Sequence, residues 1–331
     1  MKIAIAVLAT LAIGAASRAE IHSGGAHAMS FGLQDASEVH TLAVGHARSM
    51  VDGPVAALER AVSLERTRAF GYGDAYRADE CDHRDVRTLR VGASGVDLLA
   101  IASGAGDLRV EGRPGLTEVE VEAEFCASHE DLLDELDAEL VEGSRRLRLD
   151  THYPEDGDGS WWGDYYARIN LVVAVPAGMP LGIDDGSGFI DVSGVGALVI
   201  HDGSGAIDAH DISGDVRIDD GSGELVLTNV TGRVEIDDGS GSLRLEDIEG
   251  DLEVDDGSGS VRIERVMGDV DIDDGSGELR VHDVGQSVTI SDSSGSIVVR
   301  DVRGDFRVRR DGSGSIDHSN VTGVVDLPRR R

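Results

Sequence analysis

Between residues 184 and 314 the chain repeats one 18-residue pattern eight times, Gly-Ser-Gly-x-Leu-x-Leu-x-Asp-Val-x-Gly-Asp-Val-x-Ile-Asp-Asp. The steps between successive copies are 17 residues, then 18 residues five times, then 19 residues. A period this regular is typical of stacked identical units, so the chain is expected to fold as a quasi-one-dimensional array. The copies begin at Gly186, Gly203, Gly221, Gly239, Gly257, Gly275, Ser293 and Gly312.

Each copy divides into two halves that pair a glycine-rich turn with a short alternating strand. In the copy that begins at Gly239, Leu243, Leu245, Leu252 and Val254 alternate with polar residues. Alternate residues of a strand share a face, so these four side chains point inward and the polar ones outward. One half cannot bury its apolar face alone, but stacked copies can pair strand on strand about 4.8 Å apart. We therefore predict an all-β fold, a two-sided parallel β-solenoid with coils of about 18 residues, similar to a single-stranded β-helix.

Stacking in register also predicts which side chains meet inside. Two continuous aliphatic columns are expected to run along the coil axis, one in each sheet. The first column contains Leu225, Leu243, Val261, Leu279 and Ile297, and the second contains Val216, Val234, Leu252, Val270 and Val288.

The composition excludes some partners. The 331 residues carry a formal net charge of -33, so nucleic acid and anionic lipid would be repelled. Aromatic residues make up only 4% of the chain, whereas 44 residues are glycine. This balance suits a thin, regularly packed interior made of small aliphatic side chains.

The first residues are typical of a secretory signal peptide. Lys2 precedes an apolar run over residues 3–16, and small residues lie at the expected cleavage positions before Glu20. We expect residues 1–19 to be removed and the mature protein to be periplasmic, outer-membrane associated or extracellular. No later run is long enough for an integral membrane segment. Residues 20–86 lack the repeat and are predicted to form a leader that is partly helical or disordered.

Three further regions follow the leader. Residues 87–182 alternate irregularly and are predicted to be the N-terminal β part of the solenoid, with a short helical excursion at residues 130–140. A strand at residues 169–175 leads into the regular repeats of residues 183–328. Residues 329–331 form a basic tail that, with Pro328, is expected to protect the last strand from pairing with another chain.

The chain has two cysteines, Cys81 and Cys126. In an exported protein a pair of cysteines favours one disulfide, here joining the start of the folded domain to a nearby strand. A reactive or metal-binding pair is the alternative.

The repeats resemble a family of bacterial β-strand-repeat proteins known as putative adhesins, a domain of unknown function. The resemblance rests on the repeated Asp-Gly-Ser-Gly before alternating aliphatics and on the lead-in strand at residues 169–178. It covers about residues 87–328. It implies the stacked architecture but no reaction and no catalytic residues.

Paired aspartates at one corner of the coils are the most prominent polar feature. Stacked about 4.8 Å apart, these like charges repel, so each needs compensation. Solvated turns, in which each aspartate accepts turn amide hydrogens, are the favoured arrangement, and bound Ca²⁺, which prefers several oxygen ligands, is the alternative. Apart from Ca²⁺ no cofactor is expected. The candidate cation-binding residues are Asp184, Asp185, Asp219, Asp220, Asp237, Asp238, Asp255, Asp256, Asp273 and Asp274.

Two other surface features have both a structural and a functional interpretation. The loop at residues 155–166 holds Trp161, Trp162, Tyr165 and Tyr166, which would either cap the solenoid or stack on sugar rings. The second feature is an arginine column (Arg244, Arg262 and Arg280) beside Glu246 and Glu264, which indicates cross-strand charge neutralisation in preference to a binding strip.

Together these patterns predict a non-enzymatic adhesion or scaffold module of the cell envelope. The sequence contains no Gly-x-Ser-x-Gly nucleophile elbow. A serine that recurs in every coil is interpreted as structural, because an enzyme needs its catalytic site at only one place in the chain. The expected partner is an envelope protein or a glycan. The alternatives are a Ca²⁺-stabilised repeat protein and a polysaccharide-active β-helix enzyme, although coils this short are poorly suited to wall a cleft.

Overall fold

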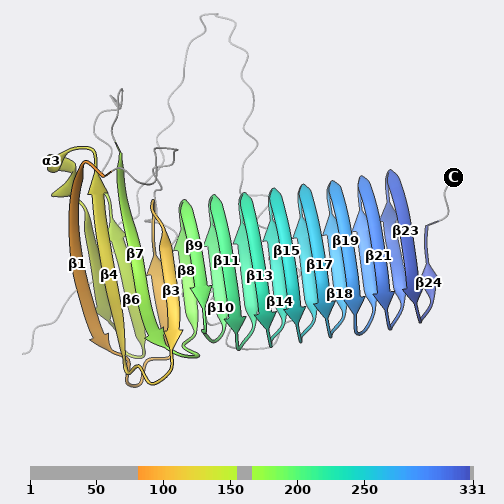
Figure 1. Ribbon diagram of the computed structural model, residues 1–331, viewed down its shortest axis with the longest axis horizontal. Helices are drawn as coiled ribbons and strands as arrows, with labels where there is room; N and C mark the ends of the chain where they lie inside the picture. The colour runs from red at the N-terminus through yellow and green to blue at the C-terminus, as the bar shows by residue number, and fades with distance from the viewer. Residues whose placement is uncertain (1–80, 155–165, 329–331) are drawn as a thin grey trace, which may run out of the picture. The chain divides into compact units, whose positions relative to one another are not determined.

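The computed structural model describes residues 81–154 and 166–328. The chain divides into two units, Met1–Met50 and Val51–Arg331, and the described residues all belong to the second. Within them two twelve-stranded sheets face each other across one hydrophobic interior. Figure 1 shows the repeated strands lying side by side as successive coils. The fold is thus the two-sided β-solenoid that the period predicts.

The first sheet, sheet A, contains one strand from each regular coil. In spatial order it consists of β1 (His83–Gly92), β4 (Glu118–Ala127), β7 (Ala167–Pro176), β3 (Leu108–Arg113), β9 (Gly188–Ser193), β11 (Gly205–Ile212), β13 (Gly223–Val230), β15 (Gly241–Ile248), β17 (Gly259–Val266), β19 (Gly277–Val284), β21 (Gly295–Val302) and β23 (Gly314–Val321).

The second sheet, sheet B, contains the other strand of each coil. In spatial order it consists of β24 (Val325–Asp326), β22 (Phe306–Asp311), β20 (Val288–Asp292), β18 (Val270–Asp274), β16 (Leu252–Asp256), β14 (Val234–Asp238), β12 (Val216–Asp220), β10 (Leu198–Asp202), β8 (Leu181–Asp185), β2 (Leu98–Ala102), β6 (Arg146–His152) and β5 (Asp137–Glu142).

The register of the parallel strands confirms both aliphatic columns. In sheet A Leu243 lies between Leu225 and Val261, and in sheet B Leu252 lies between Val234 and Val270. Every residue of the two columns is at most 2% exposed. Burial of these side chains on both faces of the interior is the main stabilising contribution, because each coil supplies apolar area that its neighbours remove from water.

The N-terminal part departs from uniform parallel stacking. β1 pairs antiparallel with β4, β4 pairs antiparallel with β7, and β5 pairs antiparallel with β6. β3 then joins this group to the regular coils through parallel pairs with β7 and β9. β1 already begins at His83, inside the stretch expected to be leader. These antiparallel strands occupy the N-terminal ends of both sheets, where a parallel coil would otherwise expose unpaired backbone.

The expected helix at residues 130–140 is wrong in its extent. Only α3 (Glu130–Leu133) is helical, and β5 follows it as a strand. The leucine spacing fits one face of a helix, but Ala138 is buried when the segment pairs with the edge of β6. Backbone hydrogen bonds to an open sheet edge outweigh a weak local helical preference.

Cys81 and Cys126 are joined by a disulfide with 5.6 Å between their Cα atoms. Cys126 lies in β4 with no exposed surface, and its partner lies two residues before the start of β1. The bond therefore ties the first described residue to the antiparallel group at the N-terminal end of sheet A.

Candidate functional site

The aspartate pairs form two ladders that face opposite ways. Because successive residues of a strand point to opposite faces, the first aspartate of a regular pair points outward and the second inward. Asp237 and Asp255 are exposed, whereas Asp238 and Asp256 are each only 2% exposed. At the first coil Asp184 and Asp185 are both buried. The sequence had grouped all ten candidates, and the structure separates an outer row from an inner row.

Turn amides compensate the inner row as expected, but this row is buried and not solvated as the sequence analysis predicted. The N–H groups of Ser222, Ser240 and Ser258 donate to Oδ1 of the aspartate two residues earlier, at 3.0, 3.1 and 3.0 Å. Burial raises the pKa of Asp238 to about 6, with Asp220 of the previous coil adding repulsion. Among the described residues no group of three or more His, Cys, Asp or Glu side chains is placed to hold a metal ion.

A second set of aspartates links coils at the corner before each sheet B strand. Oδ1 of Asp251 accepts the backbone N–H of Asp269 at 3.0 Å, and Oδ1 of Asp269 accepts that of Ser287 at 2.8 Å. Each such carboxylate therefore satisfies a turn amide of the next coil. The sequence analysis missed this role, although the Gly-Asp of the consensus marks the position in most copies.

The same corner, where each sheet A strand ends and the next sheet B strand has not yet begun, also carries a column of unusual backbone conformations. Asn229, Asp247, Arg265 and Asp283 all have φ between 57° and 58°. This left-handed conformation costs little for Asn and Asp but strains an arginine. It inserts one extra residue, so that the next residue, such as Ile248 at 1% exposure, points inward. A recurring Asn or Asp before an aliphatic residue was the sequence signal for this column.

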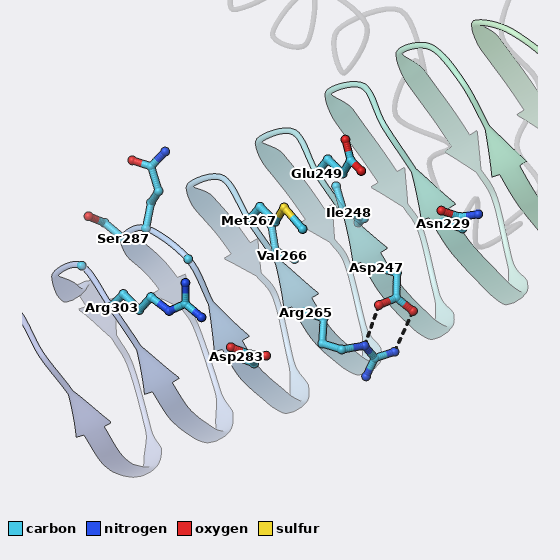
Figure 2. Close-up of a pocket in the computed structure, with 13 residues that line it drawn as sticks. Asn229, Asp247, Ile248, Glu249, Arg265, Val266, Met267, Asp283, Ser287 and Arg303 are labelled. Atoms are coloured by element: carbon cyan, nitrogen blue, oxygen red, sulfur yellow. Dashed lines mark hydrogen bonds and ion pairs between the residues drawn. The ribbon is translucent and has the colours of Figure 1, made fainter.

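A groove of about 1070 Å³ follows this corner across several coils (Figure 2). Its walls combine carboxylates, two arginines and one apolar side chain that is 66% exposed, Met267. We name it the corner groove and define it by Asn229, Asp247, Ile248, Glu249, Arg265, Val266, Met267, Asp283, Gly285, Gln286, Ser287, Arg303 and Gly304.

Arg265 organises the centre of the corner groove. Its guanidinium donates to Asp247 one coil earlier and to Glu246 Oε2 at 2.8 Å (Figure 2 draws the Asp247 pair). Nη1 also donates to Glu264 at 3.0 Å. The hydrogen bond from Arg265 holds the pKa of Asp247 below its usual range. The groove therefore combines a fixed ion-pair network with an exposed methionine, an arrangement suited to contact and not to proton transfer.

The arginine column on the outer face of sheet A forms ion pairs within its own strands. Arg244 Nε lies 2.6 Å from Glu246, Arg262 pairs with Glu264, and Arg280 pairs with Glu278 at 2.6 Å. Opposite charges are therefore interleaved along this face, but these arginines pair with residues two positions away in their own strand and not across strands as expected. Exposed pairs of this kind contribute little to stability individually.

Of the aromatic loop, Trp161, Trp162 and Tyr165 lie outside the described residues, whereas Tyr166 lies within them. The Asp82 N–H donates to the Tyr166 hydroxyl at 2.9 Å, and the guanidinium of Arg168 lies 5.9 Å from the centre of its ring. Tyr166 is thus tied to the residues that surround the disulfide.

No helix among the described residues is both long and apolar enough to cross a membrane. The aspartates of the inner row do not line the corner groove, which runs along the other corner of the coils. Acidic groups with raised pKa and an accessible cleft are therefore separate features of this solenoid.

Comparison with known families gives one match. Residues 166–320 match the family model described as Toastrack DUF4097. Among curated proteins, none matches the chain.

Several solved structures are similar in fold. A putative adhesin from Parabacteroides distasonis is 11% identical, with coverage of 71% of this chain and 97% of that one and a TM-score of 0.39. A putative lipid binding protein from the same organism is 16% identical, with coverage of 79% and 100% and a TM-score of 0.37. A putative cell adhesion protein from Clostridium sporogenes is 11% identical, with coverage of 74% and 100% and a TM-score of 0.27.

Proposed function

Because the chain carries a Toastrack DUF4097 domain over residues 166–320, we propose that it is a non-enzymatic adhesion or scaffold module of the cell envelope. The signal-peptide pattern of residues 1–19 supports export. The corner groove carries the binding part of the proposal, because it runs across coils and displays the same backbone position at each step. Such a surface fits an extended partner that lies along the coil axis.

The geometry favours binding over catalysis. General acid–base chemistry needs a titratable group within reach of a bound substrate. Here the aspartates with the most strongly raised pKa values are nearly inaccessible, since Asp202 and Asp256 are 6% and 2% exposed. The carboxylate at the centre of the groove, Asp247, has a lowered pKa and is held by Arg265. Neither set is placed to act as an acid or base on a ligand.

Export is tested by fractionating cells that express the full-length chain. The proposal expects a product lacking residues 1–19 in the envelope or medium, and replacement of Ala19 by a large charged residue should leave the precursor uncleaved. Full-length protein confined to the cytoplasm would contradict the export step.

The binding step is tested with the purified mature chain and an isolated envelope fraction. The change Met267→Asp should weaken binding because it removes the exposed apolar contact of the groove. Val172→Asp is the matched control, since Val172 is also an exposed aliphatic residue, at 47%, but lies on β7. Equal binding by both variants and the parent chain would contradict the groove as the contact surface.

Two treatments of the envelope fraction separate the partner classes. Periodate oxidation destroys glycan diols, whereas protease digestion removes proteins. Loss of binding after only one treatment identifies the partner as glycan or protein. Binding that survives both would contradict an envelope glycan or protein as the partner, and a repeat with chelator shows whether divalent cations take part.

A further inference from the structure

The inner aspartates form a continuous row through the solenoid. The strand register places each one directly against the corresponding residue of the next coil. All of them are at most 6% exposed. We name this row the inner ladder and define it by Asp185, Asp202, Asp220, Asp238, Asp256, Asp274 and Asp292.

Each regular carboxyl group of the inner ladder has one satisfied and one unsatisfied oxygen. Oδ1 of Asp220, Asp238, Asp256 and Asp292 accepts a serine N–H, whereas their buried Oδ2 atoms have no hydrogen-bond partner in the protein. A buried ionised oxygen without a donor is strongly disfavoured. Because successive coils repeat this arrangement, it is a regular feature of the 18-residue unit and not a local irregularity.

The charges around the ladder do not neutralise it. The groups that act on Asp256 are its ladder neighbours Asp238 and Asp274, the outer Asp255 of its own strand and the amide of Ser258. At the two ends, Asp185 faces Ser103 and Tyr153, and Asp292 faces Asp311 and the guanidinium of Arg310. Across the interior, sheet A presents aliphatic side chains. The middle of the ladder therefore contains several carboxyl groups in succession without a cationic partner acting on them.

We propose that the inner ladder is a proton-binding column, in which buried carboxyl groups take up protons near neutral pH and so hold the coils together more firmly in mild acid. A proton removes the charge that burial disfavours and gives the spare oxygen a hydrogen to donate. Neutral carboxyl groups can also approach each other at the spacing of successive coils, about 4.8 Å, without repulsion.

The titration of these groups agrees with this geometry. Burial, followed by repulsion between neighbouring carboxylates, raises the pKa of Asp256 to about 7 and that of Asp274 to about 6. Burial also raises the pKa of Asp185 and of Asp202. An unfolded aspartate has a pKa near ~3.9.

The sign of the pH effect follows from these directions. Groups with raised folded pKa values stabilise the fold fully below the unfolded value, and this stabilisation is lost as pH rises through the folded values. The ladder should therefore make the solenoid most stable at about pH 4. Stability should fall as pH rises from there through the folded pKa values of about 6 to about 8, and should level off above them. The carboxylates with lowered pKa, Asp211, Asp247 and Asp301, act in the opposite direction, but only below about pH 4.

A divalent cation fits the ladder less well than protons. Ca²⁺ takes about six to eight oxygen ligands. The described residues hold no cluster of three or more carboxyl, imidazole or thiol side chains suited to a metal ion. Most ladder members offer a single spare oxygen, because the other already accepts a serine amide.

The decisive experiment is the melting temperature of the mature protein across about pH 5 to pH 8.5, with chelator present. The proposal expects a fall of several degrees as pH rises. Asp256→Asn should raise the melting temperature at high pH and reduce the fall, because the amide keeps an oxygen for the Ser258 N–H. The matched control Asp317→Asn alters an exposed aspartate of β23 that lies outside the ladder and should retain the full pH dependence.

A measurement on the unmodified chain keeps the proposal testable if the variant does not fold. Refolding from denaturant near pH 7 in unbuffered solution should take up protons, and a pH electrode records them. Proton release, or no uptake, would overturn the proposal. So would a melting temperature that is flat or rises with pH, or one that millimolar Ca²⁺ restores fully at high pH, since the last result would assign the ladder to metal.

Discussion

Arg265 donates two parallel hydrogen bonds to Asp247 of the preceding coil, from Nε to Oδ1 at 2.6 Å and from Nη2 to Oδ2 at 2.9 Å. The backbone of Arg265 is in the left-handed conformation, and the equivalent positions of the neighbouring coils hold Asn or Asp. The left-handed conformation strains the backbone of this arginine, and the bidentate contact that it makes between coils in the centre of the corner groove offsets the strain.

Replacement of Arg265 separates the strain from the ion pairs. Arg265→Asn should leave stability nearly unchanged, because relief of about 1 kcal/mol of backbone strain offsets the lost surface pairs. Arg265→Ala should destabilise the fold by about 1 kcal/mol, since alanine keeps the strain and loses the pairs. Urea unfolding of both variants measures the difference, and equal losses would show that the backbone conformation carries no strain.

The aliphatic columns predict a large effect from one buried truncation. Leu243→Ala removes a side chain that is 2% exposed between Leu225 and Val261, and should cost about 2–5 kcal/mol. Ser260→Ala, an exposed change on the adjoining strand, should stay within about 0.5 kcal/mol. The urea midpoints of the two variants provide the comparison, and similar midpoints would contradict a shared interior.

The corner glycines predict that an added side chain would clash with the backbone of the preceding coil. Gly241 has φ 155°, and a Cβ there would lie 1.8 Å from the carbonyl oxygen of Gly223 in the coil before. Gly241→Ala should therefore prevent tight stacking and lower the folded yield or the melting temperature sharply. Gly92→Ala is the matched control, because no atom lies within 4 Å of the added methyl group. Equal circular dichroism melting curves for both variants would refute the close approach of the coils.

The disulfide predicts a local effect on the N-terminal strands. Cys81 and Cys126 are separated by 45 residues, for which loop entropy gives about 4 kcal/mol of stabilisation. Cys81→Ser combined with Cys126→Ser should speed amide hydrogen exchange in β1 while leaving β19 unchanged. Uniform acceleration over both strands would instead mean that the disulfide stabilises the entire stack.

Most of the architecture could be predicted from the repeat. The period, the alternation of Leu243 and Leu245 with polar residues, and the glycine corners together leave stacked parallel strands as the arrangement that buries every apolar face. In each regular coil the local strand and turn preferences agree with the packing between coils. The sequence therefore predicts the strands of this region and their stacking correctly.

The irregular part was less predictable because tertiary contacts override local pattern. Ala138 and Leu140 belong to a segment whose leucine spacing fits a helix, yet the segment pairs with β6 because the sheet edge offers backbone hydrogen bonds. The antiparallel placement of β1 and β4 at the end of sheet A likewise depends on which edge remains open after the coils have stacked.

The candidate site shows the same division. The aspartate pairs were visible in the sequence, but the separation of Asp237 from Asp238 into an exposed and a buried row depends on the inward direction of each strand position. The corner groove was not predicted, because it arises where Asp247 of one coil lies beside Arg265 and Met267 of the next.

By itself, the sequence determined that identical coils stack and which aliphatic residues they share, because a short half-coil can bury its apolar face only against its own copies. Only the tertiary structure decided which carboxyl groups lose contact with water and which residues of separate coils share a groove. Solvation and proximity between coils depend on how closely the corners approach, and residues such as Asp256 and Arg265 acquire their properties from neighbours 18 residues away.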